Sequence, residues 1–387
     1  MSASVGINLL WCVPSVVGGT EEYAVRTTMS LLDQAPDDMA FTLFVLRPFA
    51  DAYPELCAMC DVEVAEIDGS NRPQRVWYET TWLRHKTRER GIQLLHHVGG
   101  TIPAMRPVTS ILTLHDLQPL ALPENFGLVK RNYLRAAIPR SVARAEVVVV
   151  PSDFVGREVI ERFDLRPEQV VTVSAGYDLP VLLDLDDPLV PEAVAALVED
   201  PDPYFVYPAI THRHKDHATA IRAVAKARDD GTPVRLVLTG GSGEADGSVD
   251  SLIAELDLED LVWRLGRVER RVLELLVARA EALLFPSRFE GFGIPVLEAM
   301  ALGCPVIAAD ATAVPEVGGR AVVLVPPGDV TAWTAAIENR VGNVPERSEV
   351  ADAGRVQAAA FAWSRAGGRL LDVYRGALVL SAMEPSP

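Results

Sequence analysis

The chain has 387 residues, 49% of them hydrophobic, which is enough for two ordinary domains with separate cores. Its formal net charge of −17 argues against general nucleic-acid binding, because such binding needs a basic surface to neutralise phosphates. The first basic residue is Arg26, and no apolar run approaches the roughly 20 residues of a membrane span, so we expect a soluble cytosolic protein.

Short apolar runs alternate with longer periodic stretches along the chain. The runs predicted as strands are 5–11, 41–46, 93–98, 110–116, 146–152 and 169–175 in the first half, and 204–209, 234–241, 261–266, 282–287, 305–310 and 321–326 in the second. Stretches such as 217–231 and 269–282 have helical spacing. This alternation predicts an α/β fold with doubly wound parallel sheets covered on both faces. Ligands of such sheets bind beyond the carboxyl ends of the strands.

The loop "VGGTEEY" at 17–23 follows the first predicted strand. Its glycines would let the backbone approach a phosphate, and Thr20 is predicted to cap the next helix. The loop lacks G-x-G-x-x-G, which argues against a dinucleotide site. No Gly-Lys pair occurs in the chain, which excludes a standard P-loop.

The four cysteines include one C-x-x-C pair, Cys57 and Cys60. A zinc site would need a second pair or histidines at ligand spacing, and none follows. The alternatives are a redox pair and two small apolar residues on one helical turn.

The stretch 72–91 is basic, with six bases against two acids, and Trp77, Tyr78 and Trp82 lie among them. One interpretation is docking to an anionic membrane surface or to a lipid-linked acceptor. The alternative is the solvated charged face of a helix that packs on the core.

His115 and Asp116 stand at the end of the predicted strand in "ILTLHDL". A His-Asp pair at this position could handle protons or hold a hydroxyl-rich substrate. The alternative is a buried structural histidine.

Composition marks a domain boundary after this first half. The stretch 181–202 is rich in proline and acid and contains no base. We therefore predict a first domain at 1–180, a linker at 181–202 and a second domain at 203–362.

The second domain opens with a strand followed by "THRHKDH" at 211–217. Arg213 and Lys215 are cations suited to a diphosphate. His212, His214 and His217 raise a metal site as the alternative. Phosphate binding is favoured, because no carboxylate or cysteine is patterned with these histidines.

The stretch "FEGFGIPVLEAM" at 289–300 places two carboxylates around the start of a predicted helix. Pro295 suits a first helical turn, and the glycines before it let a ligand approach the free N–H groups, which bind anions. Glu298, inside the helix, is better placed to accept hydrogen bonds from hydroxyls than to meet a phosphate. The alternative is that Glu298 only complements the helix dipole and that Glu290 is a surface residue.

At this point the sequence resembles a known family. "PSRFEGFGIPVLEAMALGCPVIAAD" is similar to the E-x7-E signature of retaining glycosyltransferases of family 4, which have the GT-B fold. The segments "GGTEEY", "LHDLQPLALPENF", "VPSDFVGREVI", "THRHKDH" and "ATAVPEVGGRAVVLVPPGD" follow the family's order. The resemblance covers about residues 5 to 376. It implies two Rossmann-like domains facing across a cleft, with the last helix, within 363–387, crossing back to the first domain.

The resemblance also implies an activity and a set of site residues. The family transfers a sugar from a nucleotide diphosphate to an acceptor hydroxyl, with retention and with neither a cofactor nor a catalytic metal. His115, Asp116 and Glu290 would act near the donor sugar, Glu298 would hold the ribose and Lys215 the diphosphate. The donor-binding residues carried over are Gly18, Gly19, Lys215, Gly240, Gly266, Arg267, Val268, Gly291, Phe292, Gly293, Ile294 and Glu298.

Two positions depart from the family pattern. The usual arginine before the phosphate lysine is Ala209, so Arg213 is our candidate for the second cation. The usual Asn-Gly after the last strand of the first domain is Ala175-Gly176. The variant "LHDLQPLALPENF" resembles mannosyltransferase-like members most, which makes GDP-mannose the expected donor.

Three functions other than sugar transfer are alternatives. A glycoside hydrolase would use the two glutamates as acid and base, but it has no use for phosphate-binding glycines or Lys215. A non-enzymatic nucleotide-sugar binding protein would have no reason to keep His115 and Glu290 in the cleft. An epimerase of the same fold would release a free sugar epimer and need no acceptor.

Overall fold

The computed structural model describes residues 2–16, 18–105, 108–341 and 344–383. The chain forms two compact units: an N-terminal unit of Met1–Gly176 with Ala362–Pro387, and a C-terminal unit of Tyr177–Phe361. The stretch predicted as a linker, 181–202, contains helix α9 (Glu192–Glu199), which buries Val194 and Leu197. Composition predicted the ranges 1–180, 181–202 and 203–362, and these domain bounds remain a prediction.

The N-terminal unit is built on a seven-stranded parallel sheet with the order β3-β2-β1-β4-β5-β6-β7. Its strands are β1 (Ala3–Asn8), β2 (Met39–Leu46), β3 (Asp61–Ala65), β4 (Leu94–His97), β5 (Thr109–Thr113), β6 (Val147–Val150) and β7 (Val170–Thr172). Each of the runs predicted as a strand in this half is one. The sequence reading missed β3, because Asp61 and Glu63 interrupt its apolar residues. A strand at a sheet edge can keep such polar side chains.

The C-terminal unit has a six-stranded parallel sheet with the order β10-β9-β8-β11-β12-β13. Its strands are β8 (Tyr204–Pro208), β9 (Arg235–Thr239), β10 (Val262–Gly266), β11 (Ala282–Phe285), β12 (Val306–Ala309) and β13 (Val323–Val325). All were predicted from their apolar runs. The doubly wound α/β fold is thus confirmed for both units.

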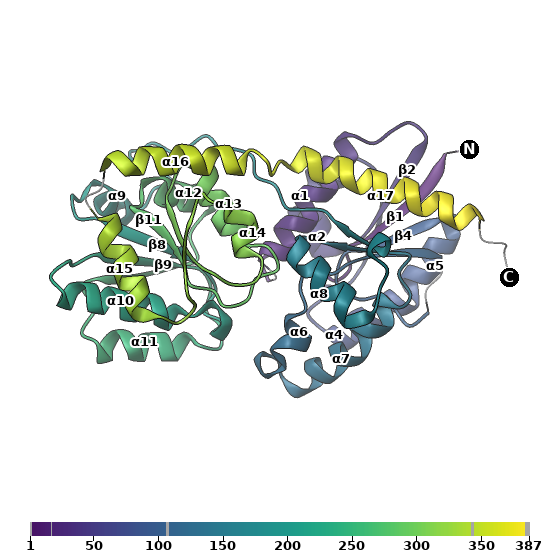
Figure 1. Ribbon diagram of the computed structural model, residues 1–387. Coiled ribbons are helices and arrows are strands. Elements are labelled where there is room, and N and C mark those ends of the chain that lie inside the picture. The colour runs from purple at the N-terminus through teal and green to yellow at the C-terminus, as the bar shows by residue number, and fades with distance from the viewer. Residues whose placement is uncertain (1, 17, 106–107, 342–343, 384–387) are drawn as a thin grey trace. The chain divides into compact units, whose positions relative to one another are not determined.

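Helices connect the strands in both units (Figure 1). Those of the N-terminal unit are α1 (Gly19–Asp33), α2 (Arg47–Ala52), α3 (Pro54–Cys57), α4 (Arg72–Thr80), α5 (Trp82–Glu89), α6 (Gln118–Ala121), α7 (Leu128–Val142), α8 (Asp153–Phe163) and α17 (Trp363–Met383). Those of the C-terminal unit are α9, α10 (His217–Asp229), α11 (Asp246–Glu255), α12 (Arg270–Arg279), α13 (Ile294–Ala301), α14 (Val314–Gly318), α15 (Val330–Arg340) and α16 (Val344–Ala358). Of the helices that the structure describes, none combines the length and the apolar content that crossing a bilayer requires.

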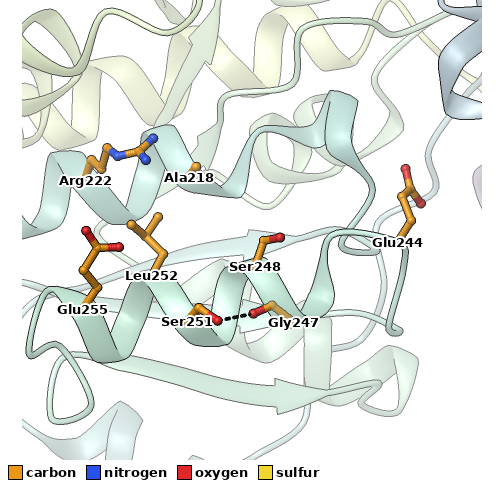
Figure 2. A pocket seen from close by; sticks show the side chains of 8 residues that line it. All are labelled: Ala218, Arg222, Glu244, Gly247, Ser248, Ser251, Leu252 and Glu255. Atoms are coloured by element: carbon orange, nitrogen blue, oxygen red, sulfur yellow. Dashed lines mark hydrogen bonds between the residues drawn. The ribbon is translucent and has the colours of Figure 1, made fainter.

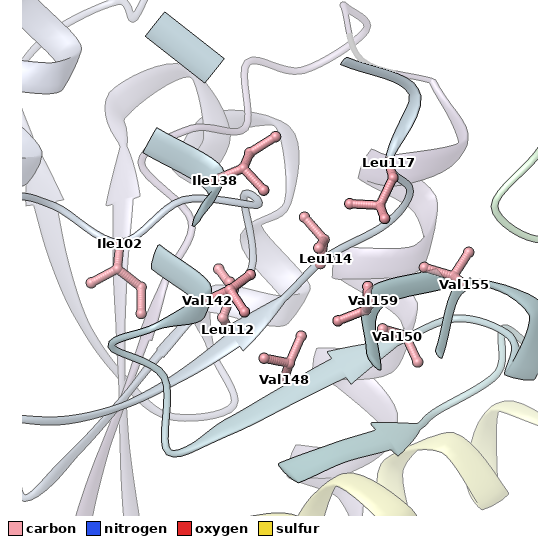
Figure 3. Close-up of a cluster of buried hydrophobic side chains, with 10 residues drawn as sticks. All are labelled: Ile102, Leu112, Leu114, Leu117, Ile138, Val142, Val148, Val150, Val155 and Val159. Carbon is pink, nitrogen blue, oxygen red and sulfur yellow. The ribbon is translucent and has the colours of Figure 1, made fainter. Parts of the chain in front are cut away.

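A compact aliphatic cluster holds one half of the N-terminal sheet to its helices (Figure 3). Side chains from β5, β6, α7 and α8 meet in it. Its buried members are Ile102, Leu112, Leu114, Leu117, Ile138, Val142, Val148, Val150, Val155 and Val159. This packing fixes the end of β5, from which His115 and Asp116 follow.

The last helix, α17, packs along α1 in the N-terminal unit, which confirms the predicted return of the chain (Figure 1). Ser30 Oγ donates a 2.7 Å hydrogen bond to the carbonyl oxygen of Trp363 at the start of α17. A Cβ atom added to Gly367 would lie 2.5 Å from the carbonyl carbon of Ser30. Glycine at position 367 therefore lets the two helices approach this closely.

Candidate active site

The strand order of the C-terminal sheet reverses between β8 and β11, which are paired neighbours. Ligands of doubly wound sheets bind at such a switch point, beyond the carboxyl ends of the strands. Several bonds join the loops that follow these two strands, among them the ion pair of Arg288 with Asp216 at 2.7 Å. The N–H of Arg288 donates to the carbonyl oxygen of His214 at 2.8 Å, and Lys215 pairs with Glu290. Two of the residues predicted to meet the donor are thus brought together here.

Lys215 is held at the end of a short 3-10 turn, Arg213–Lys215. Its carbonyl oxygen accepts a 2.6 Å hydrogen bond from the hydroxyl of Tyr207, a buried residue of β8. Its ammonium Nζ lies 2.6 Å from Oε1 of Glu290 and 5.8 Å from the ring centre of Phe285. The two charged side chains are 19% and 13% exposed, so this is a largely buried ion pair.

The chain then turns into α13 through Gly293, whose φ of 103° lies in the left-handed region. A side chain there would be strained, so the glycine has a conformational reason. The helix begins at Ile294, with Pro295 in its first turn, as predicted. The N–H of Glu290 donates to Oγ1 of Thr312 at 3.0 Å, which orients the loop before the turn.

Glu298 lies one turn into α13 and is 9% exposed. Its Oε1 accepts a 2.6 Å hydrogen bond from Nη2 of Arg270, the first residue of α12. The same guanidinium donates through Nε to Oε1 of Glu274 at 2.8 Å. Arg270 therefore bridges two nearly buried carboxylates.

Sequence reasoning missed Arg270 entirely. Its pairing with Glu274, four residues on, is a spacing that a helix surface makes visible. Nothing in the sequence shows that it reaches Glu298, because that contact joins α12 to α13. The ring of Tyr177 completes the group, since its centre lies 5.9 Å from the guanidinium carbon of Arg270.

The second cation predicted beside Lys215, Arg213, is exposed. Its N–H donates to Oε1 of Glu244 at 3.1 Å, and the other oxygen of that carboxylate accepts from Nδ1 of His212. The structure therefore gives Glu244 a role that sequence reasoning missed: it orients the start of this turn. Position 209, an alanine, lies with its carbonyl oxygen against Gly240.

The histidines of the same stretch do not form a ligand set. His212 and His214 stack at 5.7 Å, and His217 packs against the ring of Tyr207 at 4.6 Å. Within the described part of the chain, no three His, Cys, Asp or Glu side chains gather as a metal site would need. Burial lowers the pKa of both His214 and His217 to about 4.

Four of the predicted donor-binding residues lie at or just beyond the ends of β9 and β10. Gly240 and Gly266 have φ values of 127° and 65°, and the N–H of Gly240 donates to the carbonyl oxygen of Gly266 at 2.8 Å. A Cβ on Gly240 would lie 2.4 Å from the carbonyl oxygen of Ala209, so packing alone requires glycine there. Arg267 is exposed and Val268 half-buried.

Most of the loop predicted at 17–23 belongs to α1, and a carboxylate of that helix, Glu21, holds Ser15 before it. Glu21 accepts hydrogen bonds from the N–H of Ser15 at 2.9 and 3.1 Å and from the hydroxyl of Tyr53 at 2.6 Å. The prediction that Thr20 caps the helix is wrong. Gly18, with a φ of 62°, holds the cap position, and Thr20 lies inside the helix that begins at Gly19. The sequence shows Glu21 near the start of this helix, but it does not show that Glu21 binds Ser15 and Tyr53.

His115 and Asp116 follow β5 as predicted, with different partners. Nε2 of His115 lies 2.8 Å from the carbonyl oxygen of Val98. Burial lowers the pKa of His115 to about 4, so the ring is neutral near pH 7 and donates from Nε2. Its Nδ1 is then an acceptor. Oδ1 of Asp116 accepts from the N–H of Gln118 at 2.9 Å, a bond that starts α6.

A groove of about 570 Å³ runs between α10 and α11 of the C-terminal unit (Figure 2). Its lining consists of Ala218, Arg222, Glu244, Gly247, Ser248, Ser251, Leu252 and Glu255. Glu244, which holds the turn of Arg213, is the member that links it to the candidate site. None of the residues predicted to bind the donor lines it.

The C-x-x-C pair lies elsewhere. Cys57 ends α3 and Cys60 lies before β3, and both thiols are free. Burial raises the pKa of Cys57, and it raises that of Cys60 to about 12. Both are therefore protonated thiols near pH 7, unlike the reactive thiolates of redox pairs.

Two family models match the chain. Residues 17–180 match the model described as "Glycosyltransferase Family 4", and residues 192–357 match that described as "Glycosyl transferases group 1". O-antigen chain mannosyltransferase B of Escherichia coli is 26% identical over 272 residues, covering 69% of this chain and 70% of the relative. O-antigen chain mannosyltransferase RfbU of Salmonella typhimurium is 27% identical over 319 residues, covering 77% and 84%.

Solved structures share the fold at low identity. Sucrose-phosphate synthase from Thermosynechococcus elongatus has a TM-score of 0.75 at 18% identity, covering 98% of this chain and 100% of that one. WaaG, a glycosyltransferase involved in lipopolysaccharide biosynthesis, has a TM-score of 0.71 at 13% identity, covering 95% and 99%. The two family models show that the chain belongs to the family 4 type of glycosyltransferases, and the solved structures share its GT-B fold of two parallel-sheet domains.

Proposed function

We propose that the protein transfers a hexose from a nucleotide-diphosphate sugar to a hydroxyl of a glycan, lipid-linked or small-molecule acceptor, with retention. The observation that carries the proposal is the C-terminal switch point. There Lys215 and Glu290 lie beside the glycine turn into α13, and Glu298 lies further along the same helix. The sugar would meet Glu290, the diphosphate would meet Lys215 and the glycine turn, and the ribose would meet Glu298.

The charges of the site fit a diphosphate leaving group. Negative charge builds on that group as the bond to the sugar breaks. The Lys215 ammonium and the first N–H groups of α13 would stabilise it, and such preorganised groups commonly supply the largest part of catalysis. Glu290 holds the ammonium in place until the donor arrives.

We propose a front-face mechanism in which the leaving phosphate helps to remove the proton of the acceptor hydroxyl. His115 would accept a hydrogen bond from the donor sugar through Nδ1, since its Nε2 is engaged with Val98. Because the cationic charge comes from the protein, we propose that neither a metal nor another cofactor takes part. Activity that is unchanged in EDTA is the expected result, and restoration by added Mg²⁺ after loss in EDTA would contradict it.

GDP-mannose is the donor we propose. The support is that relatives matching over most of this chain are named mannosyltransferases. A third, the MMP alpha-(1->4)-mannosyltransferase of Mycolicibacterium hassiacum, is 30% identical over 65% of this chain and 59% of the relative. We propose a cytoplasmic location, where nucleotide sugars are available.

The test is a thermal-shift screen of UDP, GDP, ADP and TDP, followed by transfer assays with the sugars of the base that binds. A nucleotide at about 100 times its Kd stabilises the fold by about 2.7 kcal/mol, which raises the melting temperature by about 5–10 °C for a unit of this size. A shift with GDP alone supports the proposal, and a shift with UDP alone would move the donor to a UDP-sugar. No shift with any of the four would contradict the site.

The alternative activities predict other products. The two glutamates of a glycoside hydrolase would include a protonated acid, whereas here each carboxylate lies against its own cation. Hydrolysis of a sugar substrate without any nucleotide would revive that activity. Binding without transfer over a broad acceptor panel would favour a binding protein, and release of a free sugar epimer would favour an epimerase.

A further inference from the structure

The N-terminal unit exposes apolar side chains on two helices that the proposed transfer does not use. On α4, Trp77 is 61% exposed, and on the first turn of α7, Leu128 and Val129 are 66% and 86% exposed. Single exposed apolar residues are common on protein surfaces and need no explanation. Here they include a tryptophan and two adjacent aliphatic side chains, in stretches that also carry Arg72, Arg75 and Lys130.

The two helices lie close enough for their charged groups to interact. The charges of Arg72 and Arg75, on α4, act on the ammonium of Lys130, on α7. The hydroxyl of Tyr133, one turn further along α7, is influenced by Glu79 and Arg75 of α4. We call these exposed side chains of α4 and of the start of α7 the α4–α7 surface.

The charge of this region opposes that of the whole chain. Residues 72–90 carry six bases, and 128–144 carry five bases and no acid, whereas the chain has a net charge of −17. Of the two acids, Glu79 is buried and its pKa is raised to about 7 by burial, and Glu89 pairs with Lys86 at 2.9 Å. At α5, Lys86 and Arg90 also pair with Glu63 of β3. On α4 itself, which carries Arg72 and Arg75, little negative charge offsets the bases.

We propose that the α4–α7 surface docks the protein on an anionic lipid bilayer. Trp77 and Tyr133 are of the types that gather at the level of the headgroups, and Leu128 and Val129 would enter the acyl boundary. The bases around them would pair with anionic headgroups. A chain of net charge −17 would otherwise be repelled by such a surface.

Other partners fit this surface less well. A second copy of the chain that used the same surface would bring cations against cations. A nucleic acid would pair with the bases but would offer nothing for the two adjacent aliphatic side chains. The inference does not depend on the donor or the chemistry of the transferase, because none of its residues belongs to the candidate active site.

The test is co-sedimentation of the full chain with vesicles. Binding is expected to vesicles of phosphatidylcholine and phosphatidylglycerol, to fall with rising salt, and to be absent with phosphatidylcholine alone. Each Lys or Arg near an anionic surface changes the partition roughly fivefold, so the double variant Arg72→Gln/Lys130→Gln should bind roughly 25-fold more weakly. The matched control, Arg279→Gln/Arg320→Gln, removes two exposed bases of the C-terminal unit and should bind like the unaltered chain.

Trp77 provides a second readout. It is the one exposed tryptophan of the six, all of which lie in the described part of the chain, so a blue shift of the emission on vesicle binding should vanish in Trp77→Phe. Equal binding to both kinds of vesicle, or equal binding by the double variant and its control, would overturn the inference. So would binding to heparin or nucleic acid without binding to vesicles, which would assign the surface to a soluble polyanion.

Discussion

The variant Lys215→Met tests whether Lys215 binds the donor or only stabilises the fold. In the absence of donor the Lys215 ammonium pairs with Glu290 at 2.6 Å, and both side chains are largely buried. Removing one partner of a fully buried pair costs about 3–5 kcal/mol, and an exposed pair contributes about 0–1 kcal/mol. For this pair we expect a loss of about 2 kcal/mol, because the remaining carboxylate is 13% exposed and keeps some contact with water.

The effect on turnover should be larger than the effect on stability. If Lys215 stabilises charge on the leaving diphosphate, its loss should lower kcat about 100- to 1,000-fold, as the loss of one preorganised donor does in other enzymes. The folded state should survive, with a melting temperature lower by about 6 °C. The measurements are steady-state transfer with the native donor and thermal unfolding of the same preparations.

Lys226→Met is the matched control in the same unit. Lys226 pairs with Asp230 at 2.6 Å, but these side chains are 41% and 42% exposed, so the change should cost less than about 1 kcal/mol and leave turnover intact. The double variant Lys215→Met/Glu290→Gln should be more stable than the sum of its single changes, because it leaves no unpaired charge. Turnover of Lys215→Met close to that of the unaltered enzyme would refute the diphosphate assignment.

Three further changes test the fold and the turn. Gly367→Ala should lower the free energy of unfolding by about 1–3 kcal/mol, because its Cβ would meet Ser30 in α1, whereas Gly376→Ala in the same helix, which meets nothing within 4 Å, should raise it by about 0.5–1 kcal/mol. Chemical denaturation measures both, and equal effects would contradict the close docking of α17. Burial lowers the pKa of His96 to about 3, so below pH 6.5 the unfolded chain binds a proton that the folded chain does not. The free energy of unfolding should therefore fall from pH 7 to pH 5, and it should fall less steeply in His96→Gln. If the free energy of unfolding depends on pH equally in the unaltered chain and in His96→Gln, the prediction is contradicted. Gly293→Ala should lower the free energy of unfolding by about 1–2 kcal/mol, because the φ of 103° at this position is strained for alanine. It should also raise the KM for the donor, since this turn orients the first amides of α13 toward it. An unchanged KM would argue against that role of the turn.

The general architecture could be read from the sequence because it depends on local patterns. Strands buried on both faces are continuous apolar runs, and such runs gave every strand except β3, where Asp61 and Glu63 interrupt the pattern. The turn into α13 was also predictable, because glycine and Pro295 have backbone preferences that do not depend on distant residues. The basic run of α7 is likewise a feature of neighbouring residues in the sequence.

The sequence by itself determined the α/β class, the strand positions and the residue types of the candidate site, since periodicity and backbone preference are properties of neighbouring residues. Only the tertiary structure decided which side chains of the candidate site pair with one another. Lys215 meets Glu290 because β8 and β11 are adjacent in the sheet, and Arg270 bridges to Glu298 because α12 lies beside α13. Such contacts depend on strand order and helix packing, which set distances between residues that are far apart in the chain.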